Sequence, residues 1–285
     1  MLRKSPAMDS PQHTAFYRFT PLADPAAAAA TLRELAQGLL GAIVVAGEGV
    51  SGALAGSKET VAAFEAALQQ AEVLGGALRG MAFKHSACAV APFGRLKVSV
   101  KPEIVALGLP DEHGAVDEHD ASHLAPAAWR ELLARGDAVV LDNRNHFEYR
   151  LGHFRGAVDP QVHNFRDFTA YVEARAPAWR EAGRPVAMYC TGGIRCDKTA
   201  PWLRSLGLQV FQLEGGILNF FDRMPDAGRD WLGECFVFDR RIALDTALRE
   251  TATGIEQVYD PALPDEAWRL KRARQLDVSS GDDPG

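Results

Sequence analysis

Three short, strongly apolar runs in the second half of the chain constrain its fold most. They cover Ala138–Asp142, Pro185–Tyr189 and Gln209–Leu213. Runs of this length without polar alternation are typical of strands buried on both faces of a sheet. Strands that alternate with helices predict an α/β domain with a mainly parallel sheet, whose ligand sites lie at the carboxyl ends of its strands. The helices are expected at Phe165–Arg175, at Lys198–Leu206 and from Gly215–Gly216 onward.

The first half of the chain shows a different order of elements. Strand, helix, strand, strand, helix and strand follow one another, which is the split βαβ pattern of a ferredoxin-like α+β domain. Apolar residues at helical spacing, and Ser57 as a cap before the second helix, support this order. The expected strands are Phe16–Phe19, Ala42–Ala46, Gly52–Ala55, Met81–His85 and Leu96–Val100, and the expected helices are Pro25–Leu40 and Lys58–Leu74.

A chain of 285 residues fits about two domains of ordinary size. We predict an N-terminal domain over residues 13–105, a linker over 106–125, a second domain over 126–232 and a C-terminal tail over 233–285. A short helix at Pro126–Arg135 opens the second domain. Met1–Gln12 is expected to be a loose leader, and Ser279–Gly285 is expected to be disordered.

The composition excludes several classes of protein. The net charge of -6 does not by itself indicate a nucleic-acid partner, which would need a local basic patch. The 4 cysteines, Cys88, Cys190, Cys196 and Cys235, are too few for a disulfide scaffold, and none pair at C-x-x-C spacing. Met1–Gln12 is polar and lacks the apolar run expected of a signal peptide, and no stretch approaches the roughly 18 apolar residues of a membrane span. We therefore predict a cytoplasmic protein without a membrane partner, in a reducing compartment where a thiol stays reactive.

The sharpest candidate for chemistry is the loop between the second apolar run and the helix after it. Its glycines let the backbone curl until successive N–H groups point inward, and the following helix adds the positive end of its dipole. Arg195 adds a cation, so a thiol at the base of this ring should have a lowered pKa and react as a thiolate. The predicted nucleophile is Cys190, and the loop continues through Thr191, Gly192, Gly193, Ile194 and Arg195.

The size of this ring separates two kinds of chemistry. Cys190 and Arg195 enclose 4 residues, whereas cysteine phosphatases use a ring one residue larger, so the loop favours a sulfur substituent over a phosphoryl group. A structural cysteine beside a glycine turn is the competing interpretation. Cys196 either begins the next helix as a small apolar residue or acts as a resolving thiol. Cys88 and Cys235 are expected to be core residues.

These residues resemble a rhodanese domain over about residues 126–230. The resemblance implies a rhodanese-like α/β domain behind the ferredoxin-like one, in which Asp142 and Arg144 support the active loop. An ordinary ion pair between them is the alternative. The matching segments are Leu141–Arg144, Glu148-Tyr149, Gly152–Ala157 and the loop Cys190–Arg195.

The wider chain, over residues 13–245, is similar to the rhodanese-containing tRNA uridine hydroxylase family. The resemblance implies oxygen-dependent 5-hydroxylation of uridine 34 in the tRNA anticodon, with molecular oxygen as co-substrate and Cys190 as the essential residue. Two departures matter. Gly49-Val50-Ser51-Gly52 stands where the family often reads Gly-Ile-Asn-Gly, and no cysteine follows Cys235, whereas longer members carry a Cys-rich segment there. We therefore predict no metal, and no other cofactor is evident in the sequence. The matching segments include Val45–Gly52, Phe93–Val98, Lys101–Val105, Tyr189–Lys198 and Gly233–Asp239.

A tRNA substrate requires phosphate contacts, and the first domain supplies candidates. An ordinary solvated face is the competing interpretation of these charges. Glu48 and Ser51 lie in a turn that either lines a cleft or is purely structural. The candidate tRNA contacts are Lys84, Arg95, Lys97 and Lys101, with His85 beside them.

Two other functions compete with hydroxylation. The first is a sulfurtransferase that moves sulfane sulfur through a Cys190 persulfide. The second is a non-catalytic RNA-binding or scaffold protein with a vestigial rhodanese domain, which the intact loop disfavours. For hydroxylation, either Cys190 adds to the pyrimidine ring and activates its neighbouring carbon, or a sulfur–oxygen species on Cys190 delivers the oxygen.

Overall fold

The computed structural model describes residues 10–70, 72–109 and 122–278. The chain divides into two compact units, unit 1 up to Ile104 and unit 2 from Val105. Most of the predicted leader, much of the predicted linker and the predicted disorder at Ser279–Gly285 lie outside the described residues.

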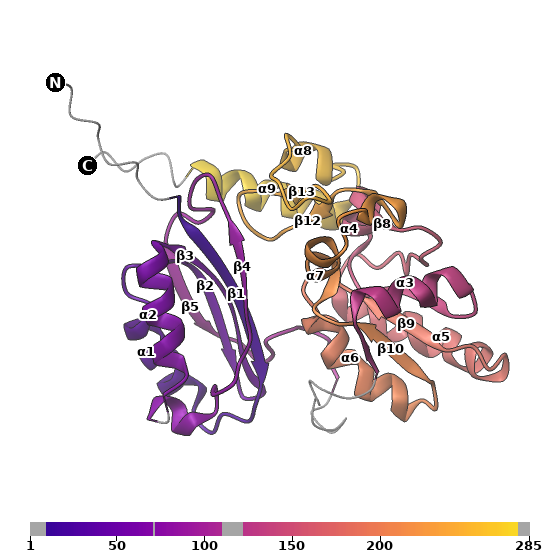
Figure 1. Ribbon diagram of the computed structural model, residues 1–285, viewed down its shortest axis with the longest axis horizontal. Coiled ribbons are helices and arrows are strands. Elements are labelled where there is room, and N and C mark those ends of the chain that lie inside the picture. The colour runs from indigo at the N-terminus through magenta and orange to yellow at the C-terminus, as the bar shows by residue number, and fades with distance from the viewer. Residues whose placement is uncertain (1–9, 71, 110–121, 279–285) are drawn as a thin grey trace. The chain divides into compact units, whose positions relative to one another are not determined.

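Unit 1 is a 5-stranded sheet with both of its α-helices on one face (Figure 1). The strand order is β4-β1-β3-β2-β5, so the ferredoxin-like arrangement of the first four strands is extended by β5, parallel to β2. This confirms the predicted ferredoxin-like class. The elements are β1 (Gln12–Phe19), α1 (Pro25–Leu35), β2 (Leu40–Ala46), β3 (Gly49–Gly56), α2 (Lys58–Leu68), β4 (Phe83–Ala87) and β5 (Leu96–Val100).

The helices of unit 1 are shorter than the sequence predicts. Asp24 and Ser57 cap α1 and α2 by accepting backbone N–H groups, as their positions suggest. α1 ends at Leu35 because Gly38 has a φ of 84° and Leu40 already pairs with β3. α2 ends at Leu68, and a short 3-10 turn with left-handed backbone follows at Val73–Gly76.

Unit 2 is built on a 4-stranded sheet with the order β6-β10-β9-β7, in which every neighbouring pair is parallel. This confirms the predicted parallel sheet. α5 and α6 pack on one face around Val186 and Met188, and α3 and α7 pack on the other around Ala187 and Tyr189 (Figure 1). The elements are β6 (His123–Leu124), α3 (Pro126–Arg135), β7 (Val139–Asp142), α5 (Phe168–Glu181), β9 (Val186–Tyr189), α6 (Ile194–Ser205), β10 (Val210–Leu213) and α7 (Gly216–Arg223).

Several elements of unit 2 lie where the sequence predicts only connection or tail. β6 falls within the predicted linker, yet it pairs with β10 as the edge strand of the sheet. A two-residue strand carries no periodicity, so sequence pattern alone does not reveal it. The remaining elements are α4 (His146–Leu151), β8 (Gly152–Phe154), β11 (Trp231–Gly233), β12 (Cys235–Phe236), β13 (Ala243–Leu244), α8 (Ile255–Val258) and α9 (Pro264–Val278).

The residues after 232 form a small core of their own within unit 2. Phe236, Val258, Tyr259 and Leu270 are buried together against Phe147 of α4. β11 also pairs with β8. Among the described residues, no helix is long and apolar enough to cross a membrane.

Candidate active site

Cys190 directly follows β9, at the carboxyl end of a central strand of the parallel sheet. The Gly193 N–H donates to the Cys190 Sγ over 3.1 Å, and Gly193 adopts a φ of 102° that favours glycine. α6 begins at Ile194, four residues before the predicted start at Lys198. Arg195 and Cys196 therefore lie in the first helical turn, where backbone N–H groups are free to bind other acceptors.

The loop stabilises the ionised form of Cys190. Burial alone raises the pKa of this thiol, but four features oppose it: a hydrogen bond from the Cys196 thiol, the charge of Arg195, and the backbone N–H groups of Cys196 and Arg195. The net effect lowers the pKa of Cys190 to about 6. The thiolate, which is the nucleophilic form, therefore predominates at neutral pH.

The pKa of Cys196 shifts in the opposite direction to that of Cys190. Burial, and then the hydrogen bond it donates to Cys190, raise the pKa of Cys196 well above its ordinary value. The Asn143 amide donates to its sulfur over 3.8 Å. Cys196 is thus a buried helix residue and also a thiol donor toward Cys190, and its role as a resolving thiol stays a prediction.

The amino end of α7 holds the outer side of the loop. The Ile217 N–H donates to the Cys190 carbonyl over 3.0 Å, and the Leu218 N–H donates to the Thr191 carbonyl over 3.2 Å. Gly216 has a φ of 72°, and a Cβ placed there would lie 2.5 Å from the Cys190 oxygen. Carbonyls held outward by α7 leave the N–H groups of the loop turned inward. The sequence predicted only that a helix begins at this Gly-Gly pair.

Arg195 is fixed by a carboxylate to which the sequence assigned no role. Its two terminal nitrogens contact the Glu148 oxygens at 3.0 and 3.1 Å, and Glu148 is fully buried. Glu148 lies in the first turn of α4, where its side chain accepts the Asn145 backbone N–H over 3.2 Å. The Asn145…Glu148 spacing is the sequence signal that could have revealed this helix.

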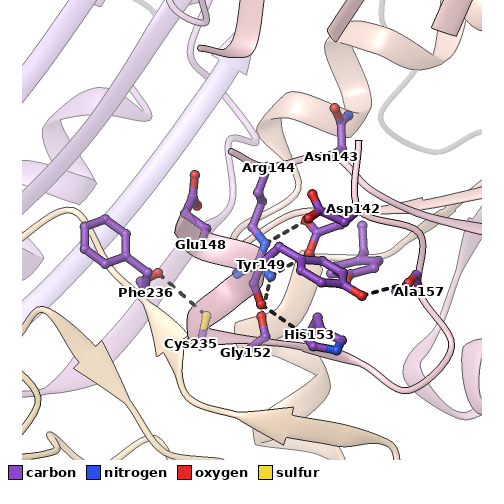
Figure 2. Close-up of polar contacts among 12 residues, drawn as sticks. Asp142, Asn143, Arg144, Glu148, Tyr149, Gly152, His153, Ala157, Cys235 and Phe236 are labelled. Carbon is purple, nitrogen blue, oxygen red and sulfur yellow. Dashed lines mark hydrogen bonds and ion pairs between the residues drawn. The ribbon is translucent and has the colours of Figure 1, made fainter. Parts of the chain in front are cut away.

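Asp142 and Arg144 form a fully buried, bidentate ion pair (Figure 2). Arg144 also donates to the Gly152 carbonyl over 2.6 Å. The Tyr189 hydroxyl donates to Asp142 over 2.7 Å, and Asp142 and Tyr189 face each other on neighbouring strands. The pair therefore holds together the two strand ends beside the residue that precedes Cys190.

Comparison with known proteins finds a matching domain family for each of the two units. Residues 12–104 match the UPF0176 acylphosphatase like domain, and residues 125–222 match the rhodanese-like domain. A Jannaschia sp. protein named tRNA uridine(34) hydroxylase is 42% identical over 83% of this chain and 76% of its own length. Proteins with the same name from Nitrobacter winogradskyi and Synechococcus elongatus are 42% and 43% identical, over 83% and 82% of this chain and 92% and 85% of their own lengths.

The chain belongs to the tRNA uridine(34) hydroxylase family. This confirms the family that the sequence resemblance indicated. It does not test the roles of single residues, which stay predictions from the geometry described above.

The basic residues predicted to contact tRNA do not form one cluster in unit 1. Lys84 lies on β4 and Lys97 on β5, which are the opposite edges of the sheet. Arg95 and Lys101 are exposed just before and just after β5, and Lys84 lies 5.5 Å from the centre of the Tyr17 ring. Their role in tRNA binding stays a prediction, now with two separate edges.

Two of the three remaining residues that the sequence singled out have identified partners. His85 contacts Glu65 at 2.7 Å, and Glu48 accepts the Ile104 N–H over 2.6 Å at the turn between β2 and β3. The Thr191 hydroxyl is buried and has no hydrogen-bond partner among the described residues. Within the same residues, no three His, Cys, Asp or Glu side chains gather into a group that could hold a metal ion.

Proposed function

We propose that this chain hydroxylates carbon 5 of uridine 34 in the tRNA anticodon, with Cys190 as the reactive thiol and molecular oxygen as co-substrate. The observation that carries the proposal is the buried Cys190 thiolate, with a pKa of about 6, in a ring of N–H donors closed by Arg195. The relatives that match 83% of this chain are named tRNA uridine(34) hydroxylase, which supports the same substrate. A tRNA substrate and a reactive thiol both favour a cytoplasmic location.

A thiolate in this position can activate the pyrimidine ring by addition. The Cys190 sulfur forms a bond to carbon 6, and the electron pair of the ring double bond moves to carbon 5. Carbon 5 then attacks molecular oxygen, and the terminal oxygen of the resulting peroxide anion takes up one proton, which yields a carbon 5 hydroperoxide. A thiol reductant supplies two electrons and two protons, so that the outer oxygen leaves as water. Loss of the carbon 5 proton and of the Cys190 thiolate restores the double bond and leaves the hydroxyl.

Mass spectrometry of tRNA nucleosides tests the proposed function. Cells that lack this protein should lose 5-hydroxyuridine and its derivatives, and the wild-type chain should restore them. Cys190→Ser should fail to restore them, whereas Cys88→Ser, which changes a buried cysteine of unit 1, should succeed. Unchanged hydroxylated uridines would contradict the proposal.

The addition step and the oxygen requirement have separate tests with the purified chain. A tRNA with 5-fluorouridine at the target position should form a covalent adduct with Cys190, because fluorine at carbon 5 blocks the final elimination. Isotopically labelled oxygen gas should place its label in the new hydroxyl. Label arriving from water, or turnover under argon, would exclude oxygen as the source. A labelled product without any adduct would instead favour oxygen transfer from a sulfur–oxygen species.

A sulfurtransferase is the second candidate, because the ring of Cys190 and Arg195 has the size that suits a persulfide. The loop N–H groups would stabilise the terminal sulfur anion of a Cys190 persulfide. Incubation with thiosulfate should then add one sulfur to the Cys190 peptide, and cyanide should release it as thiocyanate. Absence of this mass shift, together with hydroxylation of tRNA, would exclude the sulfurtransferase and leave hydroxylation as the function.

A further inference from the structure

Phe238 is an exposed aromatic side chain beside the candidate active site. It is 60% exposed, whereas its neighbours Phe236 and Val237 are buried. Single exposed apolar residues are common on protein surfaces and by themselves indicate nothing. Phe238 differs from an ordinary exposed apolar residue in the turn that carries it and in the residues that its ring contacts.

The turn that displays Phe238 is tightly held. It connects β12 to β13, and its base is closed by the Val237 N–H, which donates to the Ile242 carbonyl over 2.9 Å. Asp239 and Arg241 form a bidentate pair across the turn, with nitrogen–oxygen distances of 2.6 and 2.9 Å, and both side chains are nearly buried. A buried ion pair fixes the backbone on the carboxyl side of Phe238. Its exposed ring therefore has a defined position.

Phe238 contacts the cation of the catalytic loop. The Arg195 guanidinium carbon lies 5.5 Å from the centre of the Phe238 ring and 5.7 Å from that of Phe165. Arg195 is the residue whose charge lowers the pKa of Cys190, and Glu148 fixes its position. The Phe236 ring meets Phe238 edge to face at 4.9 Å. The exposed side chain of Phe238 thus lies next to Arg195, the residue that completes the loop around Cys190.

We propose that Phe238 stacks on an unpaired base of the anticodon loop and thereby holds the target uridine beside Cys190; this inference rests on the proposed function. Unpaired RNA bases are recognised by stacking on aromatic rings and on arginine planes, and both groups meet here. An enzyme that modifies a base must also hold it away from its neighbours while the reaction proceeds. A fixed, exposed ring at the rim of the site serves that purpose.

Steady-state hydroxylation of an anticodon stem-loop RNA measures the contribution of Phe238. Phe238→Ala should raise KM about 5- to 150-fold, the range expected for one lost base–aromatic stack, with a smaller change in kcat. Phe238→Tyr should stay within about threefold of wild type because the ring remains, whereas Phe238→Leu should resemble the alanine variant. Trp268→Ala is the matched control, because Trp268 is also an exposed aromatic residue, with 57% of its surface exposed. The centre of its ring lies 5.4 Å from the guanidinium carbon of Arg272, which is also on α9. Loss of this ring should change neither KM nor kcat.

A second measurement excludes a purely structural role for Phe238. If the ring only steadied Arg195, Phe238→Ala would shift the pH profile of Cys190 alkylation by iodoacetamide. Stacking predicts an unchanged profile together with the raised KM. A shifted profile with unchanged KM, or equal constants for Phe238→Ala and wild type, would overturn the inference.

Binding of abasic RNAs identifies the stacked base without relying on turnover. Dissociation constants would be measured for the intact stem-loop and for stem-loops without the base at the target position or at either neighbour. One of these losses should cancel the effect of Phe238→Ala. An equal effect of the variant on all four RNAs would overturn stacking. Hydroxylation by wild type, measured in parallel, shows separately whether the proposed function holds.

Discussion

Cys190 and Cys235 lie in the same unit, and both are buried free thiols, yet their surroundings drive their acidities apart. Burial raises the pKa of Cys235 to about 12; Arg144 opposes this rise, whereas Glu148 and Asp142 add to it. Its sulfur lies 3.7 Å from the Phe236 carbonyl, an acceptor that favours the protonated thiol (Figure 2). Cys190 is equally buried, yet its pKa is lowered to about 6. Burial therefore does not make a thiol inert; the groups that face the sulfur decide its reactivity.

The largest expected effect separates the two cysteines by activity. Cys190→Ser should reduce tRNA hydroxylation at least about a thousandfold, because a hydroxyl is not ionised at neutral pH and cannot replace the thiolate. Cys235→Ser should retain most of the activity in the same assay. An active Cys190→Ser variant would show that the acidic thiol is not the nucleophile.

The pH dependence of stability should have opposite signs for the two thiols. An ordinary thiol has a pKa of about 8.5, so between about pH 6 and 8.5 the unfolded Cys190 holds more protons than the folded one. Its contribution to the free energy of unfolding is therefore present above that range and lost as the pH falls toward 6, by on the order of a few kcal/mol. For Cys235 the folded state holds more protons above about pH 8.5, so its contribution is lost as the pH rises toward 12.

Urea unfolding of wild type, Cys190→Ser and Cys235→Ser across this pH range measures both contributions. The free energy of unfolding of wild type, minus that of Cys190→Ser, should grow as the pH rises to about 8.5. The free energy of unfolding of wild type, minus that of Cys235→Ser, should shrink as the pH rises above about 8.5. Parallel curves for all three proteins would mean that the two sites have ordinary acidities.

A substitution at Gly216 should raise the pKa of Cys190 and so make this thiol less reactive, as the Cys235 thiol is. Gly216→Ala would push a methyl group toward the Cys190 and Thr191 carbonyls in a left-handed backbone, which should turn the loop and displace its N–H donors. We expect a loss of activity of about a hundredfold, as for removal of an oxyanion donor, and a higher pKa of Cys190 in alkylation assays. Gly183→Ala is the control, since Gly183 has a φ of 61° but open space around it. Equal effects of the two variants would attribute the loss to backbone strain alone.

The smallest expected effect concerns the thiol donor to Cys190. Cys196→Ala removes one hydrogen bond to the thiolate and should raise the pKa of Cys190 by about one unit. Cys196→Ser keeps a donor and should shift it less. The rate of Cys190 alkylation as a function of pH measures both variants. If serine and alanine shift the pKa equally, the hydrogen bond from residue 196 is not what stabilises the thiolate.

Much of the reactive centre was predictable because its signal is local. The apolar run before Cys190, the two glycines and Arg195 lie within one short segment, and the backbone of that segment already dictates a ring of N–H groups. The parallel sheet was predictable for a similar reason, since short apolar runs without polar alternation indicate strands that are buried on both faces. The start of α6 at Ile194 was missed because the apolar Ile194 and Cys196 alternate with the charged Arg195 and Asp197 in its first turn, and this alternation is not the apolar spacing of a helix.

The groups that tune Cys190 and surround its loop come from distant parts of the chain, and only the tertiary structure brings them together. Glu148 reaches Arg195 from α4, Ile217 and Leu218 hold the loop carbonyls from α7, and Phe238 approaches from the segment interpreted as a tail. Sheet order likewise separates Lys84 from Lys97, although both are basic residues of one domain. Sequence alone therefore indicated which thiol to test as the nucleophile, because an anion-binding loop is a property of consecutive residues. Tertiary structure decided what fixes its cation and what ring stands beside it, because those contacts depend on which strand ends and helix ends meet.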